Sequence, residues 1–358
     1  TIPWVKIGDM SEKYVSSTEE RITDAGFNNS SVKMLEPGIL LYSIFASIGA
    51  VSILKIPATT NQAIAGLKIK DDSLDRDFLY HYLKSRESIS KSSGRGAAQN
   101  NINLTILRNM QVTLPSIEIQ RSIVRNLEMI SNQVTIAESH LMDLDALVKS
   151  RFVEIFGDFA CYETKPLIKC VDCIEAGKSP KCLAFSRKMA EPGVLKLSAI
   201  SSGVYCENEN KALPRSVSLT IDKVVHANDI LLSRKNTPEL VGRSVLVKHT
   251  DGNIMFPDII FRMHPLPPIN AMYLSYLLAG PLLHSIQSLA HGSAKSMSNI
   301  PKSELAKLSI PIPALNLQNE FANFVSQVDK SRFGGMLHLL NSLSGIMHAS
   351  FFSVADTD

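Results

Sequence analysis

The cysteines are the residues best suited to bind a metal, and their spacing argues against a metal site. Four of the five lie close together in the sequence and the fifth follows them, at Cys161, Cys170, Cys173, Cys182 and Cys206. The pair Cys170 and Cys173 has the two-residue separation of a zinc site, but a structural zinc needs a second close pair or nearby histidines. Cys182 and Cys206 are too widely separated to complete such a site. We expect reduced thiols packed in a small sheet, and no bound metal.

The catalytic motifs are incomplete as well. Ala176-Gly177-Lys178-Ser179 resembles the end of a phosphate-binding loop, but Asp172 stands where that loop requires its first glycine. The sequence has no Gly-x-Gly-x-x-Gly, Gly-x-Ser-x-Gly or His-Glu-x-x-His motif. Pro257-Asp258 lacks the acidic-x-Lys that follows it in a typical nuclease, and Asn299-Ile300-Pro301 departs from the Asn-Pro-Pro-aromatic motif of an amino-methyltransferase. The residues predict a chain with no active site and no cofactor of its own.

Length and composition indicate an ordinary folded protein. The 358 residues suffice for two or three domains, because a domain usually takes about 100 to 200 residues. With 45% hydrophobic and 20% charged residues, the chain is neither collagen-like nor disordered. No apolar run reaches the roughly 18 to 20 residues of a membrane span, and the first residues show no secretory signal pattern. We expect a cytoplasmic protein that does not enter a membrane.

The two halves of the chain repeat each other. The difference in residue number between matching segments changes slowly along the chain, which is what insertions in loops would produce. The matching segments are residues 112–120 with 310–318 (offset 198), 96–103 with 292–299 (196), 37–43 with 228–233 (191), and 48–49 with 241–242 (193). Chance matches would scatter in their offsets. We interpret the chain as one unit that occurs twice, each copy spanning about half of the sequence.

Each copy has the same predicted order of elements. Two apolar strands joined by a polar loop come first, at residues 39–42 and 51–54 in one copy and at 229–233 and 241–247 in the other. A short amphipathic helix follows, at 77–84 and at 270–278. A polar loop with a glycine then leads to another short strand, which ends at Pro115 or Pro313 because proline is excluded from central strands but can open a helix.

A long helix follows each proline. In the first half, over residues 117–152, the apolar positions repeat in steps of three and four, which is a heptad seam: Leu127, Ile130, Val134, Ala137, Leu141, Leu144 and Val148. In the second half the seam is interrupted at residues 332–335, where we expect a kink: Phe321, Phe324 and Val328, then Met336, Leu340, Leu343 and Met347. Such a seam serves oligomerisation, bundle packing, or pairing of the two helices within one chain as a spacer.

The charge separates along the chain. The globular segments together carry a net charge of +8 and the helical segments −5, which leaves the overall +3. A polyanion would therefore meet the globular segments. Their basic and amide residues fall in predicted loops, at 61–62, 95 and 99–101 in the first copy and at 177–181, 187–188, 234–236 and 295–296 in the second. Loops of this kind supply phosphate donors, and Arg, Asn and Gln read base edges.

These motifs together resemble the specificity subunit of type I restriction-modification systems. The resemblance is in the order Gly/Asp-Ile-Leu-Leu, Ile/Val-Gly, Thr60-Asn61-Gln62-Ala63, a Gly-x-Ala loop, and Leu/Ile-Pro-x4-Gln at the start of a heptad helix. It covers nearly the whole chain. It implies an α+β protein in which two similar mixed α/β target recognition domains are joined by two long antiparallel coiled-coil helices, as a pseudo-twofold internal repeat. The domains would be residues 1–115 and 157–313, and the spacer helices 116–156 and 314–353.

The resemblance also implies the function. Each recognition domain would read one half of a split site in double-stranded DNA, and the helices would set the spacer and dock the modification subunits. Those partners would methylate adenine with S-adenosylmethionine, and a restriction subunit would join them. The candidate DNA contacts are Asn61, Gln62, Arg95, Gln99, Asn100, Lys178, Lys181, Arg187, Lys188, Arg234, Lys235, Asn236, Arg243, Lys295 and Ser296. The candidate docking and helix-pairing residues are Leu127, Ile130, Val134, Leu141, Leu144, Val148, Phe324, Val328, Leu340, Leu343 and Met347.

The first recognition domain departs from the second at its start. Residues 159–193 precede the strand at 194–197, whereas the matching strand at 4–9 begins almost at Thr1. The first domain therefore lacks an opening strand and loop, through trimming, natural truncation or completion by another chain. Two other functions stay open: a coiled-coil scaffold without sequence-specific DNA binding, and an enzyme such as a methyltransferase fragment.

Overall fold

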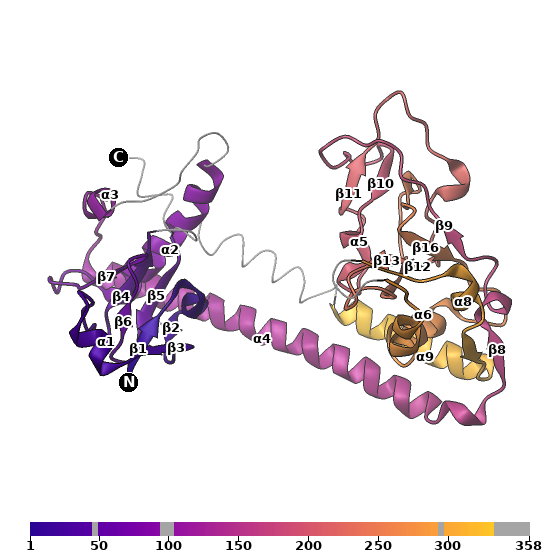
Figure 1. The fold of residues 1–358 in the computed structure, drawn as a ribbon, viewed down its shortest axis with the longest axis horizontal. Coiled ribbons are helices and arrows are strands. Elements are labelled where there is room, and N and C mark those ends of the chain that lie inside the picture. The colour runs from indigo at the N-terminus through magenta and orange to yellow at the C-terminus, as the bar shows by residue number, and fades with distance from the viewer. Residues whose placement is uncertain (45–48, 94–103, 293–296, 333–358) are drawn as a thin grey trace. The chain divides into compact units, whose positions relative to one another are not determined.

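The computed structural model describes residues 1–44, 49–93, 104–292 and 297–332. The described residues divide into two compact units (Figure 1): unit 1 lies within Thr1–Met142 and includes Arg332, and unit 2 lies within Asp143–Ser331. The division falls inside the long helix α4 (Ile117–Phe156), which begins in one unit and ends in the other. None of the described helices is long and apolar enough to cross a membrane.

Unit 1 is built from two small sheets and the helices that cover them. The first sheet has the order β3-β1-β6, with β1 antiparallel to β3 and parallel to β6. The second has the order β2-β5-β4-β7, with β4 antiparallel to both of its neighbours. The strands are β1 (Ile2–Val5), β2 (Tyr14–Val15), β3 (Glu20–Ile22), β4 (Leu40–Ser43), β5 (Val51–Leu54), β6 (Thr59–Thr60) and β7 (Ile64–Leu67). The helices before α4 are α1 (Asp24–Asn28), α2 (Arg76–Ser93) and α3 (Leu104–Arg108), with a 3-10 turn at Ile7–Met10.

Unit 2 repeats this plan and adds to it. Its sheets have the orders β11-β10-β15 and β14-β12-β16-β9, and two strand pairs, β13-β17 and β18-β8, complete it. The strands are β8 (Thr164–Pro166), β9 (Glu175–Ala176), β10 (Gly193–Leu195), β11 (Asn210–Ala212), β12 (Ile230–Ser233), β13 (Lys235–Asn236), β14 (Ser244–Leu246), β15 (Ile254–Met255), β16 (Ile260–Met263), β17 (Ser298–Asn299) and β18 (Ser309–Pro311). The helices are α5 (Ser198–Ser201), α6 (Ala271–Ala279), α7 (Leu283–Ser288), α8 (Lys302–Ala306) and α9 (Leu315–Ser331), with 3-10 turns at Phe159–Cys161, Leu167–Lys169 and Ile221–Lys223.

The layers of each unit follow from the side-chain alternation of its central strand. In unit 1, Leu40 and Tyr42 of β4 face a core shared with Phe78 of α2, while Leu41 packs against Val5 of β1 on the other face. In unit 2 the central strand β12 sits between α6 on one face and the β10 sheet on the other. Within unit 2, the β10-β11 sheet and α6 lie at opposite ends (Figure 1). Each unit is therefore a helix layer and two sheet layers.

The predicted repeat is present in this topology, but one predicted register is wrong by a residue. Leu40 and Ile230 occupy the same helix-facing position in the two central strands, pairing with Leu67 and Met263 respectively. The offset there is 190, not 191. Because both faces of these strands are buried, their continuous apolar run carries no alternation from which to choose the register.

The predicted Ile/Val-Gly match is confirmed by backbone geometry. Gly49 and Gly242 both adopt a positive φ, of 89° and 79°. Each donates its N–H to the carbonyl of the buried serine that ends the central strand, Ser43 at 3.1 Å and Ser233 at 2.9 Å. Glycine is required at both positions because a side chain disfavours this left-handed conformation.

The Pro-x4-Gln motif joins two helices in each unit. Gln120 accepts a hydrogen bond from the backbone N–H of Asp75 and donates to the carbonyl of Pro115, each at 2.8 Å. Gln318 does the same with Asn270 and Pro313, again at 2.8 Å. Asp75 and Asn270 are the N-cap residues of α2 and α6, and both glutamines are fully buried. The motif fixes the start of the long helix to the start of the short one.

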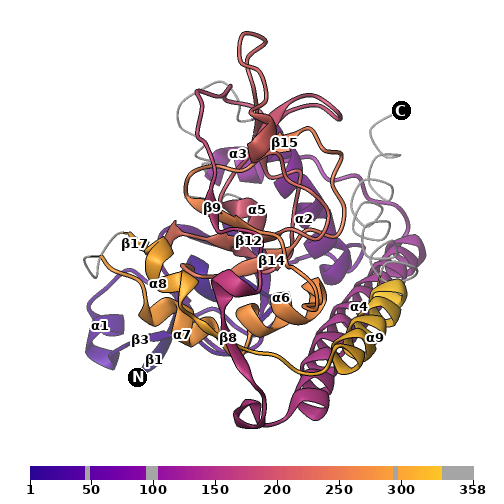
Figure 2. The same cartoon turned by 90° about the vertical axis from the view of Figure 1, so that its right-hand side faces the viewer.

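Helix α4 confirms the first predicted seam. The seam residues from Leu127 to Val148 are all buried or half-buried, whereas the residues between them are exposed, apart from Glu128. Its C-terminal part lies antiparallel beside α9 in both views (Figures 1 and 2). There Arg151 pairs with Glu320 at 2.7 Å, and the rings of Phe152 and Phe321 meet edge to face at 5.0 Å. Met336, Leu340, Leu343 and Met347 lie outside the described residues.

Three other predictions need correction. The helix predicted at 77–84 is longer, since α2 runs to Ser93. The short strand predicted before the second proline exists as β18, but residues 112–114 form no strand, because β18 is held by β8 and unit 1 has no described counterpart of β8. The cysteines are not all packed in a sheet, because Cys161 and Cys206 are exposed and only Cys170 is buried; all five are free.

Candidate nucleic-acid interface

Residues 256–259, the turn between β15 and β16 of unit 2, bring together separate segments that were predicted to contact DNA. The backbone N–H of Lys178 donates to Phe256 at 3.0 Å, and those of Arg234 and Lys235 donate to Ile259 at 2.9 and 3.2 Å. Strand β13, which starts at Lys235, pairs with β17, which closely follows the predicted contacts Lys295 and Ser296. Lys178 and the pair Arg234-Lys235, which are distant in sequence, thus meet at one turn.

Gly177 permits the first of these contacts. A Cβ atom added to Gly177 would lie 2.0 Å from the carbonyl oxygen of Phe256, which is backbone and cannot move aside cheaply. The side chains next to it are tied to the same turn, since Ser179 hydrogen-bonds to the Asp258 carboxylate. The Ala-Gly-Lys-Ser sequence is therefore used for close packing, which agrees with its incomplete match to a phosphate loop.

Two lysines at the turn form no ion pair with the described residues. Lys178 is exposed and Lys235 is half-buried, and none of the ion pairs among the described residues includes either of them. An unpaired ammonium group on a loop can bind a phosphate without first losing a protein partner. Lys181 and Lys188 are exposed and equally unpaired in the described part of the chain.

The side chains of Arg234 and Asn236 bind other groups of the protein. The prediction that residues 234–236 form a loop is wrong. Residues 235–236 are strand β13. The Arg234 guanidinium donates to the carbonyl of Asp258 at 3.3 Å and lies 5.3 Å from the centre of the Phe261 ring. Asn236 is buried, and its amide donates to Ser233 while its carbonyl oxygen accepts from the backbone of Thr237. These two side chains shape the turn.

Arg187 is also corrected from a DNA contact to an internal ion pair. Its side chain is 6% exposed and pairs with Glu207 and, at 2.9 Å, with Asp251. A further hydrogen bond at 2.8 Å reaches the carbonyl of Glu191. A side chain buried against two carboxylates is not presented to a phosphate. Arg243 is half-buried and donates to the carbonyl of Ser201 at 2.9 Å, so it also serves the interior.

Unit 1 places Asn61 and Gln62 on the equivalent turn. β6 pairs with β1 as β15 pairs with β10, so that Thr59 corresponds to Met255 and residues 60–63 to 256–259. The Asn61 side-chain oxygen accepts from the backbone N–H of Ala63 at 3.0 Å, which leaves its NH₂ group for a ligand, and Gln62 is exposed. Arg95, Gln99, Asn100, Lys295 and Ser296 lie outside the described residues.

Asp258 and Ser179 lie at this turn, although sequence reasoning did not include them among the candidate DNA contacts. Each was examined only as part of an incomplete catalytic motif. The repeat held the signal, because an offset of 196 aligns Gln62 with Asp258. The carboxylate of Asp258 would repel phosphate and accept a hydrogen bond from a cytosine amino group.

Strand β9, which leads into this site, is anchored by charge. Glu175 lies 2.9 Å from Lys223 and 3.2 Å from Arg262. Burial favours the neutral acid, but hydrogen bonds from Lys223 and Cys173 and the charge of Arg262 outweigh burial and hold the pKa of Glu175 below its ordinary value. Burial and the hydrogen bond to this carboxylate raise the pKa of Cys173 to about 12. Cys173 is therefore an unreactive thiol.

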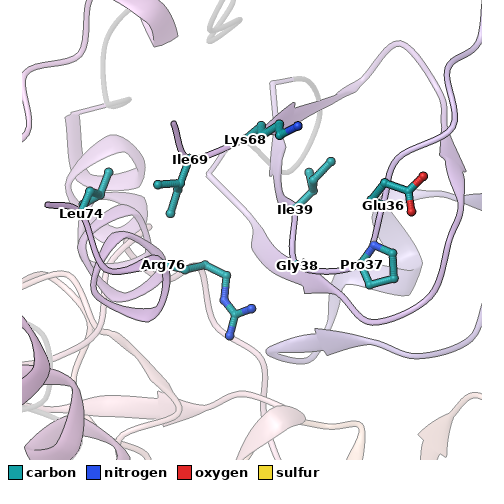
Figure 3. A pocket seen from close by; sticks show the side chains of 8 residues that line it. All are labelled: Glu36, Pro37, Gly38, Ile39, Lys68, Ile69, Leu74 and Arg76. Carbon is teal, nitrogen blue, oxygen red and sulfur yellow. The ribbon is translucent and has the colours of Figure 1, made fainter. Parts of the chain in front are cut away.

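A groove in unit 1 brings three charged side chains together. The groove in Figure 3 is lined by the segment before β4, the segment between β7 and α2, and the first residue of α2; its charged members are Glu36, Lys68 and Arg76. The three charges come from separate segments (Figure 3). Among the described residues, no group of three or more His, Cys, Asp or Glu side chains is arranged to hold a metal.

The chain is similar to proteins of one family. Residues 1–143 match the family model described as the type I restriction modification DNA specificity domain. The type I restriction enzyme EcoEI specificity subunit of Escherichia coli is 34% identical over 148 residues, which are 40% of this chain and 25% of that protein. The MjaIX specificity subunit of Methanocaldococcus jannaschii is 25% identical over 173 residues, 47% of this chain and 40% of that protein. The first 143 residues of this chain are thus similar to the DNA specificity domain of type I restriction-modification systems.

Two solved structures have a similar fold. A chain from a structure of complex assembly and conformational transition in a type I restriction-modification system aligns with a TM-score of 0.58 at 16% identity, over 97% of this chain and 90% of that chain. The S subunit from M. genitalium aligns with a TM-score of 0.50 at 14% identity over the same shares. The sequence alignments, by contrast, span a quarter to two-fifths of the length of the two curated relatives.

Proposed function

We propose that this chain is the DNA sequence-recognition subunit of a type I restriction-modification complex. Unit 1 and unit 2 each read one half of a bipartite site in double-stranded DNA. The chain has no active site of its own. Modification subunits bind S-adenosylmethionine and methylate adenine, and a restriction subunit completes the complex in the cytoplasm.

The observation that supports this proposal most is the convergence at residues 256–259. Lys178 and Lys235, which are far apart in sequence, are attached to the same turn without acidic partners among the described residues. In unit 1 the same turn carries Asn61 and Gln62, whose amides can make paired hydrogen bonds with adenine. Lysines that bind phosphate and side chains that read bases are the two components of sequence-specific DNA binding.

The packing of α4 against α9 supports a role for the helices as spacer and docking site. In unit 2 the contact combines the Arg151–Glu320 ion pair with the rings of Phe152, Phe156 and Phe321. Exposed apolar residues on α4, Met129, Ile136 and Met142, point away from the seam and are 48 to 66% exposed. A partner subunit would cover apolar groups of this kind.

Two lysine substitutions test the proposal. In the complex assembled with its modification subunits, replacing Lys178 and Lys235 by Ala should weaken DNA binding and lower the slope of log K against log salt by about 2, because each phosphate contact releases about one counterion. Affinity measured at a series of salt concentrations gives the slope. Lys165→Ala, an exposed lysine on β8, is the matched control and should leave both values unchanged.

Three outcomes would contradict the proposal. Equal affinity and slope in the double variant and the parent would remove these lysines from the interface. A complex that binds all DNA sequences equally would favour the scaffold, and methylation by the isolated chain with added S-adenosylmethionine would favour an enzyme.

A further inference from the structure

A loop of unit 2, residues 183–192, exposes two bulky apolar side chains. Met189 is 95% exposed and Phe185 is 63% exposed. Single apolar residues are common on protein surfaces, but two large ones on one short loop are typical of a binding site. The loop therefore needs an explanation beyond the packing of unit 2 itself.

Backbone hydrogen bonds attach this loop to β11, the outermost strand of the β11-β10-β15 sheet. The N–H of Leu183 donates to the carbonyl of Ala212 at 2.9 Å, and the N–H of Ala212 donates to the carbonyl of Phe185 at 3.0 Å. The Cys182 side chain packs against the small apolar cluster beneath. Phe185 is thus exposed on a segment whose backbone is fixed.

Arg187 anchors the tip of the loop from inside. Its guanidinium group, already paired with two carboxylates, donates to the carbonyl of Glu191 at 2.8 Å and so closes the turn that carries Met189. A Cβ atom added to Gly193 would lie 2.6 Å from Cδ of Arg187, so the glycine leaves room for this buried side chain. Ala190 has a φ of 64°, a left-handed conformation that few residues other than glycine adopt. Turns held in such a conformation are concentrated at binding sites.

The charge around the loop suits a polyanion. Lys181, Lys188 and, on β11, Lys211 are exposed, and none of the ion pairs among the described residues includes them. Of the acidic side chains at the loop, two are paired with Arg187, and that of Glu191 accepts the backbone N–H of Lys188 at 3.2 Å. Apolar side chains flanked by lysines without acidic partners match nucleic acid, in which phosphates surround stacked bases.

The position of the loop favours DNA over a protein subunit as its partner. The β10-β11 sheet lies at the end of unit 2 opposite α6 (Figure 1), and α6 is the helix that Gln318 joins to α9. The loop is therefore remote from the helices proposed to dock other subunits. The turn at 256–259, by contrast, follows β15 of the same sheet, and Lys178 at that turn lies in the segment that leads into the loop.

We propose that residues 185–189 form an apolar wedge for double-stranded DNA, in which Phe185 and Met189 insert between adjacent base pairs while Lys188 meets a phosphate. The wedge rests on the proposed function of the chain in DNA recognition. Apolar side chains inserted in this way unstack and kink the duplex. The cost of that deformation depends on the base step and is low at pyrimidine–purine steps, so the wedge adds sequence preference without a hydrogen bond to a base.

The salt dependence of DNA affinity tests the wedge in the complex assembled with its modification subunits. Phe185→Ser with Met189→Ser should lower the affinity about tenfold and leave the slope of log K against log salt unchanged, because an apolar contact releases no counterion. The probe is a duplex that carries the site found by sequencing DNA methylated by the parent complex. Leu at both positions keeps the apolar surface and should retain the parent affinity. Ile168→Ser, at an exposed apolar residue beside β8, is the control and should change neither value.

Fluorescence reports the insertion itself. The emission of the Phe185→Trp complex minus that of the parent complex gives the signal of one indole, which should fall about twofold on addition of the duplex because it stacks on a base. Ile168→Trp is the control and should keep its emission.

Each other outcome would overturn the wedge. Unchanged affinity in the double serine variant, or unquenched emission at residue 185, would show that the loop does not enter the DNA. A lower salt slope would make the loop a phosphate contact only, and a variant that no longer assembles with the modification subunits would make it a protein-docking loop. A parent complex that binds no DNA would overturn the proposed function as well, whereas variants that match a DNA-binding parent overturn the wedge alone.

Discussion

Units 1 and 2 share the buried residues that hold their backbone and differ in the residues of the turn at 60–63 and 256–259. Both have a central strand that ends in a buried serine, a left-handed glycine bonded to that serine, and a buried glutamine that joins two helix starts. At the turn the two units diverge, because Asn61 and Gln62 stand where unit 2 has Pro257 and Asp258. Residues that hold the backbone are repeated, and residues that face outward are not.

The second difference is the closure of the core. Unit 2 covers its central sheet with β9 and its last strand with β8, and unit 1 leaves both edges open in its described residues. Equivalent apolar side chains therefore have unequal burial. The hydrophobic contribution of a side chain scales with the area it removes from water, so the same substitution should cost more in unit 2.

The largest expected loss of stability tests the unequal burial of equivalent side chains. Met263→Ala should reduce the stability of unit 2 by about 3 kcal/mol, because it empties a fully buried site, whereas Leu67→Ala should cost unit 1 about 1 kcal/mol. Hydrogen exchange at β12 and at β4 reports the two units separately. Equal losses would show that the edge of β7 is covered after all.

The next effect concerns the close approach at the turn of unit 2. Gly177→Ala should destabilise unit 2 by about 2 to 3 kcal/mol, since the added Cβ meets the Phe256 carbonyl. The free energy of unfolding measured with denaturant should fall, and so should the affinity for DNA. Gly8→Ala in unit 1, whose Cβ would meet no atom within 4 Å, is the control. If Gly177→Ala behaves like this control, the turn does not depend on that contact.

The smallest effect should be the same in both units. Gln120→Ala and Gln318→Ala should each cost about 2 kcal/mol, because each leaves a buried backbone N–H and carbonyl without a partner. Gln133→Ala, at an exposed position of α4, should change stability by less than about 0.5 kcal/mol. If Gln120→Ala and Gln318→Ala differed greatly in their loss of stability, the two glutamines would not have equivalent structural roles.

The main elements could be predicted because each depends on local pattern. Heptad spacing predicted α4, and the Pro-x4-Gln motif correctly marked the helix starts. The register of the central strand could not be predicted, since Ile-Leu-Leu is apolar on both faces. Arg187 could not be distinguished from a surface arginine, because its partners Glu207 and Asp251 are distant from it in sequence.

The amino-acid sequence by itself determined that the chain is a repeat, where the two helices after the Pro-x4-Gln motifs begin, and the family that the chain resembles, because these follow from spacing and local residue type. Only the tertiary structure decided which charges remain available. It showed that Arg187, Arg234 and Asn236 are held by the protein while Lys178 and Lys235 meet at one turn. That choice depends on long-range contacts, and a residue's type does not reveal whether a distant carboxylate or carbonyl will reach it.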